Sequence, residues 1–151
     1  MAKGRRDLKK TAFLDSSVIF TAINSPSGGS SKLFTLRGIK LITSRVVLAE
    51  VERNVKKKLQ SYHLERFFML AQKLTISQQI PNKKLINKAK KVIVEKDSII
   101  LAEAKSAKTD FLITLDKKHF FTASVSSFLK PQKALTPKGL IQKVEVENRR
   151  V

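Results

Sequence analysis

Four acidic residues stand at the ends of apolar segments, and this placement restricts the possible folds more than any other feature of the chain. Asp15, Glu50 and Asp116 each follow an apolar run, and Asp97 precedes one. A carboxylate beside buried segments must be paired, neutralised or bound to a metal, because removing water from an unpaired charge costs more than burial returns. Carboxylates brought together also repel one another unless a hard cation such as Mg²⁺ or Mn²⁺ joins them. The pattern therefore predicts a site for a divalent cation.

The rest of the chain is strongly basic. Thirty-one Lys and Arg residues against twelve acids give a formal net charge of +19. A charge of this size indicates nucleic acid as the first partner and an anionic membrane surface as the second, with solvated lysines on a very soluble protein as the alternative. The absence of cysteine excludes disulfides and thiolate metal sites and fits a reducing cytoplasm. With only two histidines, a zinc site built on imidazole is not expected. A divalent metal on a basic body suits cleavage of a phosphodiester.

The length of 151 residues suits one domain with its own core. Residues 1–10 are assigned to a basic leader, residues 11–143 to the globular domain and residues 144–151 to a C-terminal tail that frays at its end. No signal peptide and no membrane span is expected, because Asp15 and the serines after it interrupt the first apolar stretch. We expect a cytoplasmic protein.

Strand-like and helix-like segments alternate along the chain, which predicts a three-layer α/β/α sandwich around a central, mostly parallel sheet. Strands are expected at 11–14, 39–43, 74–80, 111–115 and 133–135, the third of them at an edge. Helices are expected at 18–23, 30–37, 44–59, 62–73, 82–92 and 97–108, followed by a helical turn at 117–121. In the helix at 62–73, the side chains expected to face the core are Leu64, Phe67, Phe68 and Ala71.

The predicted sheet offers one place where the four acids can meet. In open α/β sheets, ligands bind beyond the carboxyl ends of the strands, where the connections diverge. Asp15 and Asp116 are expected at two such ends, Asp97 in the first turn of a helix and Glu50 two turns into another. Each acid alone has an ordinary interpretation as well: Asp97 can cap a helix, and Glu50 can form an ion pair with a basic residue on its own helix. Four acids in this order favour a shared site.

Four stretches resemble the motifs of the PIN-domain family, in family order and over most of the chain. They are residues 13–18 with Asp15, 48–51 with Glu50, 97–104 with Asp97 and 110–120 with Asp116. The similarity is closest to bacterial PIN proteins classed as toxins of toxin–antitoxin pairs, the VapC-like ribonucleases. It implies a PIN-like nuclease domain over residues 11–143 and a metal-dependent endoribonuclease. The alternative is a non-catalytic RNA-binding module on the same scaffold.

The same resemblance implies which residues act. The catalytic, metal-binding acids, for Mg²⁺ or Mn²⁺, would be Asp15, Glu50, Asp97 and Asp116. Thr114 would support the fourth acid, and Ser17 stands where many relatives carry Asn. Glu50 would either bind the metal or position the attacking water. The remaining acids near the motifs, Asp110 and Glu103, are assigned to surface ion pairs or helix ends, and His119 to a structural hydrogen bond.

Basic residues beside two of these acids are expected to hold RNA phosphates, with a solvated helix face as the alternative. They are Arg53, Lys56, Lys57, Lys58, Lys117 and Lys118. The resemblance further implies an RNA substrate, a homodimer and a small protein antitoxin as partners. A phosphoacceptor receiver domain is the rival interpretation of acids at strand ends. It would need two adjacent acids early in the chain, whereas Asp7 and Asp15 are separated.

Overall fold

The computed structural model describes residues 9–150, with side chains for residues 9–149, so residues 1–8 of the expected leader lie outside the described residues. A five-stranded sheet forms its centre, and every neighbouring pair of strands is parallel. The strand order is β3-β2-β1-β4-β5. The strands are β1 (Lys10–Leu14), β2 (Ile39–Thr43), β3 (Thr75–Ile76), β4 (Phe111–Ile113) and β5 (Lys133–Leu135). The predicted α/β class with a parallel sheet is confirmed.

The middle of the sheet is built from continuous apolar runs. Ala12, Phe13 and Leu14 of β1 have no exposed surface. A strand covered by helices on both faces needs apolar side chains on both, so it reads as an unbroken apolar stretch rather than an alternating one. In the register of the sheet, Leu14 lies opposite Ile113 of β4. β4 is an inner strand and ends at Ile113, two residues earlier than the sequence predicts.

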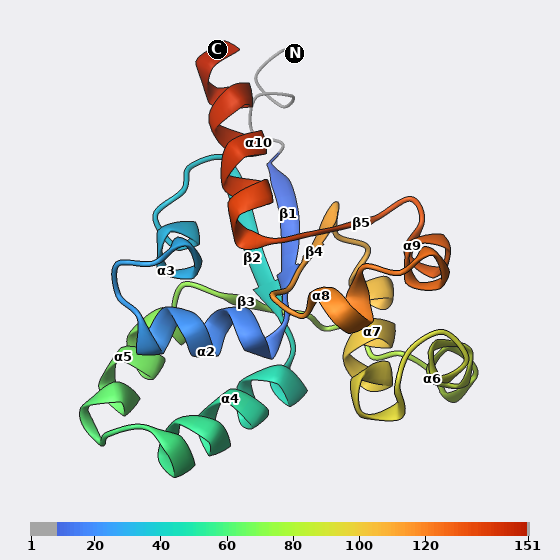
Figure 1. Cartoon of the computed structure of the whole chain (residues 1–151), viewed down its shortest axis with the longest axis horizontal. Helices are drawn as coiled ribbons and strands as arrows, with labels where there is room; N and C mark the ends of the chain where they lie inside the picture. The colour runs from blue at the N-terminus through green and yellow to red at the C-terminus, as the bar shows by residue number, and fades with distance from the viewer. Residues whose placement is uncertain (1–8, 151) are drawn as a thin grey trace.

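Helices surround this sheet (Figure 1). They are α2 (Ser16–Asn24), α3 (Gly29–Leu33), α4 (Arg45–Lys58), α5 (Tyr62–Ala71), α6 (Lys83–Lys90), α7 (Glu95–Ala107), α8 (Lys117–Phe120), α9 (Ala123–Leu129) and α10 (Pro137–Arg150). In Figure 1, α2 to α5 gather toward the β3 end of the sheet and α6 to α9 toward the β5 end. The long helix α4 follows its sequence pattern, because Val47, Val51 and Val55 are fully buried at every fourth position.

Two helices near the end of the chain differ from the sequence-based expectation. Neither α9 nor α10 is predicted, and residues 144–150, assigned to a tail, belong to α10. The start signal of α10 is nevertheless present in the sequence. The Thr136 hydroxyl accepts a hydrogen bond from the Gly139 N–H, and Pro137 occupies the first helical position, where its missing N–H costs nothing. Val144 is 4% exposed, so the supposed tail contributes to the core.

Smaller differences concern element ends and faces. In α5, Phe67 and Leu70 are buried but Phe68 is 53% exposed, because consecutive residues of a helix point in different directions and only one of two adjacent phenylalanines can face the core. β3 is an edge strand, as predicted, but spans only Thr75–Ile76.

Among the described residues, no helix is both long and apolar enough to cross a membrane.

The strand order reverses its direction at the neighbouring strands β1 and β4. The chain passes from β1 to β2 and β3 on one side, and then returns to β4 and β5 on the other. The connections leaving β1 and β4 therefore diverge, which is the arrangement that binds ligands in open α/β sheets. Asp15 and Thr114 are the first residues beyond these two strands, and the Asp15 N–H donates to the Ile113 carbonyl at 3.0 Å. The fold thus brings Asp15 beside Thr114, which precedes the other predicted strand-end acid, Asp116, by two residues.

Candidate metal centre

Asp15 is the buried centre of the acid cluster. Its side chain follows β1 and caps α2, with Oδ1 accepting the Ser16 N–H at 2.7 Å. Its other oxygen, Oδ2, accepts hydroxyl hydrogen bonds from Ser17 and Thr114, both at 2.8 Å. Asp15 is only 5% exposed. Both carboxylate oxygens are therefore held by donors that the chain itself supplies.

The two hydroxyls also fix the segment that follows β4. Ser17 Oγ accepts the Leu115 N–H at 3.1 Å, and Thr114 Oγ1 accepts the Asp116 N–H at 3.1 Å. Each hydroxyl thus donates to Asp15 and accepts from the backbone on either side of Leu115. The segment that carries Asp116 is consequently tied to Asp15 by two hydrogen-bonded bridges.

The electrostatics of Asp15 favour a nearby cation. Burial raises the pKa of Asp15 above its usual 3.8, although hydrogen bonds from Thr114, Ser17 and Ser16 act in the opposite direction. The negative charge of Asp97 raises this pKa further, so the two carboxylates are close enough to repel each other. A bound cation would relieve both effects at once.

Glu50 joins the cluster through a serine that the sequence did not single out. Its Oε2 accepts a hydrogen bond from Ser16 Oγ at 2.6 Å, and Ser16 Oγ lies 3.4 Å from Asp15 Oδ1. Glu50 comes from α4 and Ser16 from the first turn of α2. This hydroxyl therefore links Glu50 of α4 to Asp15, the N-cap of α2, and the only sequence signal for it is its place beside Asp15.

Asp97, Asp116 and His119 form a group of possible metal ligands, the one group of three or more found among the described residues. Each offers one ligand atom, and these atoms all lie within 4.8 Å of one another. His119 Nδ1 is 2.8 Å from Asp116 Oδ2 and 3.8 Å from Asp97 Oδ2. Asp15 and Glu50 are not members of this group. The sequence did not predict that His119 faces the acids, although the Asp-x-x-His spacing on one helical turn is a signal for it.

Asp116 is held in its ionised form. Partial burial raises its pKa, but the hydrogen bonds from the His119 ring and backbone, with the positive charges of His119 and Lys96, lower it more, and the net pKa lies below the usual 3.8. Asp116 also caps α8, accepting the His119 N–H at 3.1 Å. Lys96 Nζ lies 3.3 Å from Asp97 Oδ2, but its side chain is 70% exposed, so this pair is weak.

The donor set fits a divalent cation. Carboxylate oxygens suit Mg²⁺ and Mn²⁺, and an imidazole nitrogen is a further possible ligand. Asp97 and Asp116 offer atoms to a common point, and buried Asp15 contributes negative charge beside them. The acids come from four different elements that only the fold brings together.

Two acids assigned to surface ion pairs or helix ends have other roles. Glu103 is 9% exposed, and its Oε1 accepts a hydrogen bond from Ser44 Oγ at 2.7 Å. Burial raises its pKa, although the Ser44 bond lowers it in part. Asp110 is exposed, and its Oδ2 accepts the N–H of Thr11 at 2.8 Å, at the other end of the sheet from the acid cluster. Glu103 lies within an apolar stretch of α7, which explains its burial.

The predicted phosphate-binding residues lie on the helices that carry two of the acids. Arg53, Lys56, Lys57 and Lys58 are exposed on α4, and Lys117 and Lys118 are exposed on α8. Lys56 forms an ion pair with Glu52 at 3.1 Å, and Lys58 Nζ lies 6.0 Å from the centre of the Phe20 ring. These contacts leave Arg53, Lys57 and the two α8 lysines as the more available cations of this set.

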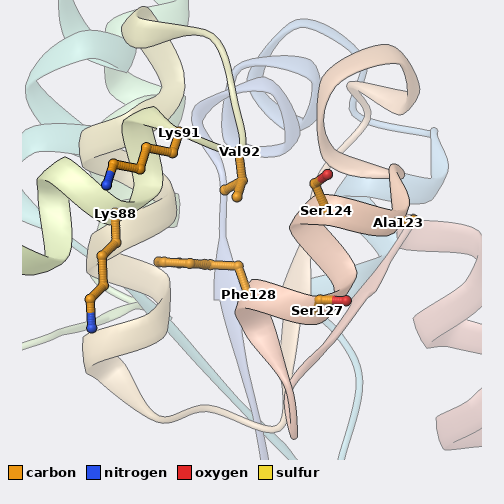
Figure 2. Close-up of a pocket in the computed structure, with 7 residues that line it drawn as sticks. All are labelled: Lys88, Lys91, Val92, Ala123, Ser124, Ser127 and Phe128. Carbon is orange, nitrogen blue, oxygen red and sulfur yellow. The ribbon is translucent and has the colours of Figure 1, made fainter.

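A separate pocket of about 600 Å³ lies between α6 and α9 (Figure 2). Its lining includes Phe128, Lys88 and Lys91, and none of the four acids. In Figure 2 the amino groups of both lysines point away from the wall that Ser124 and Ser127 form. The pocket is thus distinct from the acid cluster and does not focus its positive charges on one point.

Comparisons with known proteins agree with this arrangement. A family model described as PIN domain matches residues 12–123, a span that contains all four acids. A chain in the crystal structure of VapBC2 from Rickettsia felis, bound to a DNA fragment from their promoter, has a TM-score of 0.64 at 17% sequence identity and covers 83% of this chain and 98% of that chain. PAE2754 from Pyrobaculum aerophilum has a TM-score of 0.61 at 11% identity, covering 91% of this chain and 90% of that chain. No match was found among curated proteins.

Proposed function

This chain belongs to the PIN-domain family, and on that premise we propose that it is a metal-dependent endoribonuclease that hydrolyses RNA phosphodiester bonds with Mg²⁺ or Mn²⁺. What supports the proposal most is the contact between the four acids, on a chain of net charge +19: Ser16 links Glu50 to Asp15, Asp15 lies close enough to Asp97 to be repelled by it, and Asp97 groups with Asp116. A basic surface attracts a polyanion. A cluster of acids within that surface repels the polyanion unless a cation lies between them.

Within this proposal, Asp97 and Asp116 would hold the cation, with Asp15 as a third acid. When bound, the cation would lower the pKa of a water for attack on phosphorus and neutralise charge on the leaving oxygen. Ser17 and Thr114 keep the Asp15 carboxylate oriented and join it to the segment that carries Asp116. Such preorganisation lowers the cost of assembling the site when RNA arrives.

The remaining predicted residues would act on the substrate. Glu50, held by Ser16, would complete the metal site or position the attacking water. Arg53 and Lys56 to Lys58 on α4, with Lys117 and Lys118 on α8, would bind phosphates on either side of the scissile bond. Because these cations are exposed, their attraction for RNA would be strongest at low salt.

A nuclease assay on a mixed RNA pool, with the cleavage sites sequenced, tests this function. We expect chelation of divalent ions to abolish cleavage, and Asp97→Asn and Asp116→Asn each to lower it by at least about 100-fold, since even the loss of an outer partner of a metal ligand costs about 10–100-fold. Asn remains a good helix cap at residue 116, so α8 should persist. Asp15→Asn should also lose activity. This variant is a less direct test, because an amide cannot accept from every donor that now bonds to the Asp15 carboxylate.

Glu95→Gln is the matched control, because Glu95 is an exposed acid in the same first turn of α7 as Asp97. It should cleave RNA at nearly the wild-type rate. Undiminished cleavage by both Asp97→Asn and Asp116→Asn at saturating Mn²⁺ would show that the acid cluster is not the active site. RNA binding without any cleavage would favour the alternative of a non-catalytic RNA-binding module.

We further propose that the protein is a homodimeric toxin with a small protein antitoxin. The fold similarity to a chain of VapBC2 supports this, as do exposed apolar side chains on α5, where Tyr62 is 65% and Phe68 and Met69 are each 53% exposed. Patches of this kind often mark protein interfaces. Induced expression should arrest growth, and Asp116→Asn should relieve the arrest. A monomer by light scattering would contradict the dimer, and harmless expression of an active enzyme would contradict the toxin role.

A further inference from the structure

His119 faces the acids rather than solvent. It lies on α8, three residues after Asp116, and its side chain is 25% exposed. The ring nitrogen Nδ1 is 2.8 Å from Asp116 Oδ2 and 3.8 Å from Asp97 Oδ2. These three residues, and not the four acids, form the group whose ligand atoms all lie within 4.8 Å of one another. A nitrogen atom is therefore already in place where the cation is expected.

We propose that His119 is a nitrogen ligand of the bound cation, and that it makes the centre prefer a transition-metal ion such as Mn²⁺ or Co²⁺ to Mg²⁺. This inference rests on the metal-binding part of the proposed function. It does not depend on which RNA is cut or on the presence of an antitoxin.

The spacing of the three atoms suits a common ion. Two ligands at right angles, each about 2.1 Å from an ion, stand about 3 Å apart. The distances of 2.8 Å and 3.8 Å from Nδ1 to the two carboxylates lie on either side of this value. Asp116 and His119 come from one helical turn at a separation of three residues, which brings both side chains to the same face.

The chemistry of imidazole sets the preference. Mg²⁺ binds oxygen and keeps several waters, whereas imidazole binds the later first-row ions well, and affinity for nitrogen-containing sites rises from Mn²⁺ to Co²⁺ and beyond. Binding through Nδ1 requires that this nitrogen carry no proton, so any ring proton then sits on Nε2. A centre of oxygen ligands alone would not separate these ions in the same way.

One other arrangement uses the same short contact. His119 can donate its Nδ1–H to Asp116 and remain outside the coordination shell, orienting that carboxylate. In this case His119 would raise the affinity for Mg²⁺ and Mn²⁺ alike and would place no nitrogen on the metal. The two arrangements therefore differ in whether bound Mn²⁺ shows coupling to an imidazole nitrogen, and in the ratio of the affinities for Mn²⁺ and Mg²⁺.

Pulsed electron paramagnetic resonance of the Mn²⁺-loaded protein separates them, because it detects the ¹⁴N nucleus of an imidazole bound to Mn²⁺. The chain has only two histidines, so the signal can be assigned with two variants of the untagged protein. The matched control is His63→Gln, since His63 lies on α5, stacks on Tyr62 and contacts Gln60. We expect ¹⁴N coupling in the wild type and in His63→Gln, and none in His119→Gln. Bound Mn²⁺ without ¹⁴N coupling in the wild type would overturn the proposal.

Calorimetric titration with Mn²⁺, Co²⁺ and Mg²⁺ gives the second readout. In His119→Gln we expect the affinity for Mn²⁺ to fall by at least about tenfold, as for other disturbed metal shells, and the affinity for Mg²⁺ to fall much less. An equal loss for both ions would assign His119 to the outer, orienting role instead. Thermal unfolding without metal shows whether the variant is folded.

These measurements are independent of the proposed nuclease activity. Cleavage that persists after chelation would refute the proposed function, whereas bound Mn²⁺ lacking ¹⁴N coupling in an enzyme that needs the metal would refute only the role of His119. Bound Mn²⁺ with ¹⁴N coupling in a protein that cuts no RNA would refute the nuclease and leave the ligand assignment standing.

Discussion

The hydrogen bond between Ser44 and Glu103 should be one of the strongest local contributions to stability. Ser44 Oγ accepts the Val47 N–H at 3.1 Å, which caps α4, and donates to Glu103 Oε1 at 2.7 Å. Ser44 and Glu103 are 4% and 9% exposed. One hydroxyl thus links α4, which carries Glu50, to α7, which carries Asp97. Ser44→Ala removes both hydrogen bonds and leaves a buried carboxyl without its donor.

Two losses make up the expected effect at neutral pH. Replacing a serine cap with alanine costs about 1 kcal/mol. Removing the donor of a buried hydrogen bond costs about 1 kcal/mol more if Glu103 is neutral and about 1.5–3 kcal/mol if it is charged. We therefore expect Ser44→Ala to lower the free energy of unfolding by about 2–4 kcal/mol, which lowers the Tm by several degrees, at about 2–4 °C per kcal/mol for a chain of this size.

Urea unfolding followed by circular dichroism measures this loss. Ser61→Ala is the matched control, because Ser61 precedes α5 without a side-chain capping bond and is exposed; its effect should stay within about 0.5 kcal/mol. In a Glu103→Leu background, Ser44→Ala should cost only the cap, about 1 kcal/mol. The reasoning would be refuted by a loss below about 1 kcal/mol, or by the same loss in both backgrounds.

Three further predictions concern Glu103, the α4 lysines and Glu50. Because burial raises the pKa of Glu103 above its usual 4.5, the native protein keeps a proton that the unfolded chain releases, so wild-type stability falls as the pH rises above 4.5. Glu103→Gln should therefore be more stable than wild type at neutral pH and equally stable well below 4.5, and urea titrations that show no such convergence would contradict this. Replacing Lys56, Lys57 and Lys58 by Gln should flatten the dependence of log affinity for single-stranded RNA on log salt by about 0.7 per lost phosphate contact, whereas an unchanged slope would assign these lysines to a solvated face. If Glu50 binds the metal, Glu50→Gln should raise the Mn²⁺ midpoint of cleavage and be partly rescued by excess Mn²⁺. A fixed midpoint with a rate lowered by about 10²–10⁴-fold would assign Glu50 to the attacking water.

The sequence alone predicted the sheet and the edge at which its acids stand. The unbroken apolar run of β1 indicated a strand buried on both faces, and the valines at every fourth position of α4 indicated a helix face toward the core. Once the strands are parallel, the residues that follow β1 and β4 must share an edge. The sequence therefore predicted that Asp15 and Asp116 can meet at one edge of the sheet, without placing them there. Thr136 and Pro137 also signal the start of α10 in the sequence, but they were interpreted as a break after the last strand.

Only the tertiary structure decided which side chains meet at that edge. Contacts such as Ser16 with Glu50 and His119 with Asp97 join residues from different elements. The separation of these residues along the chain therefore does not predict the contacts. Burial is likewise a property of the packed molecule. It made Glu103 an internal acid that holds Ser44, although its charge alone suggested the surface. Local patterns determine elements because they act through neighbouring backbone groups, whereas the site depends on distances that only packing sets.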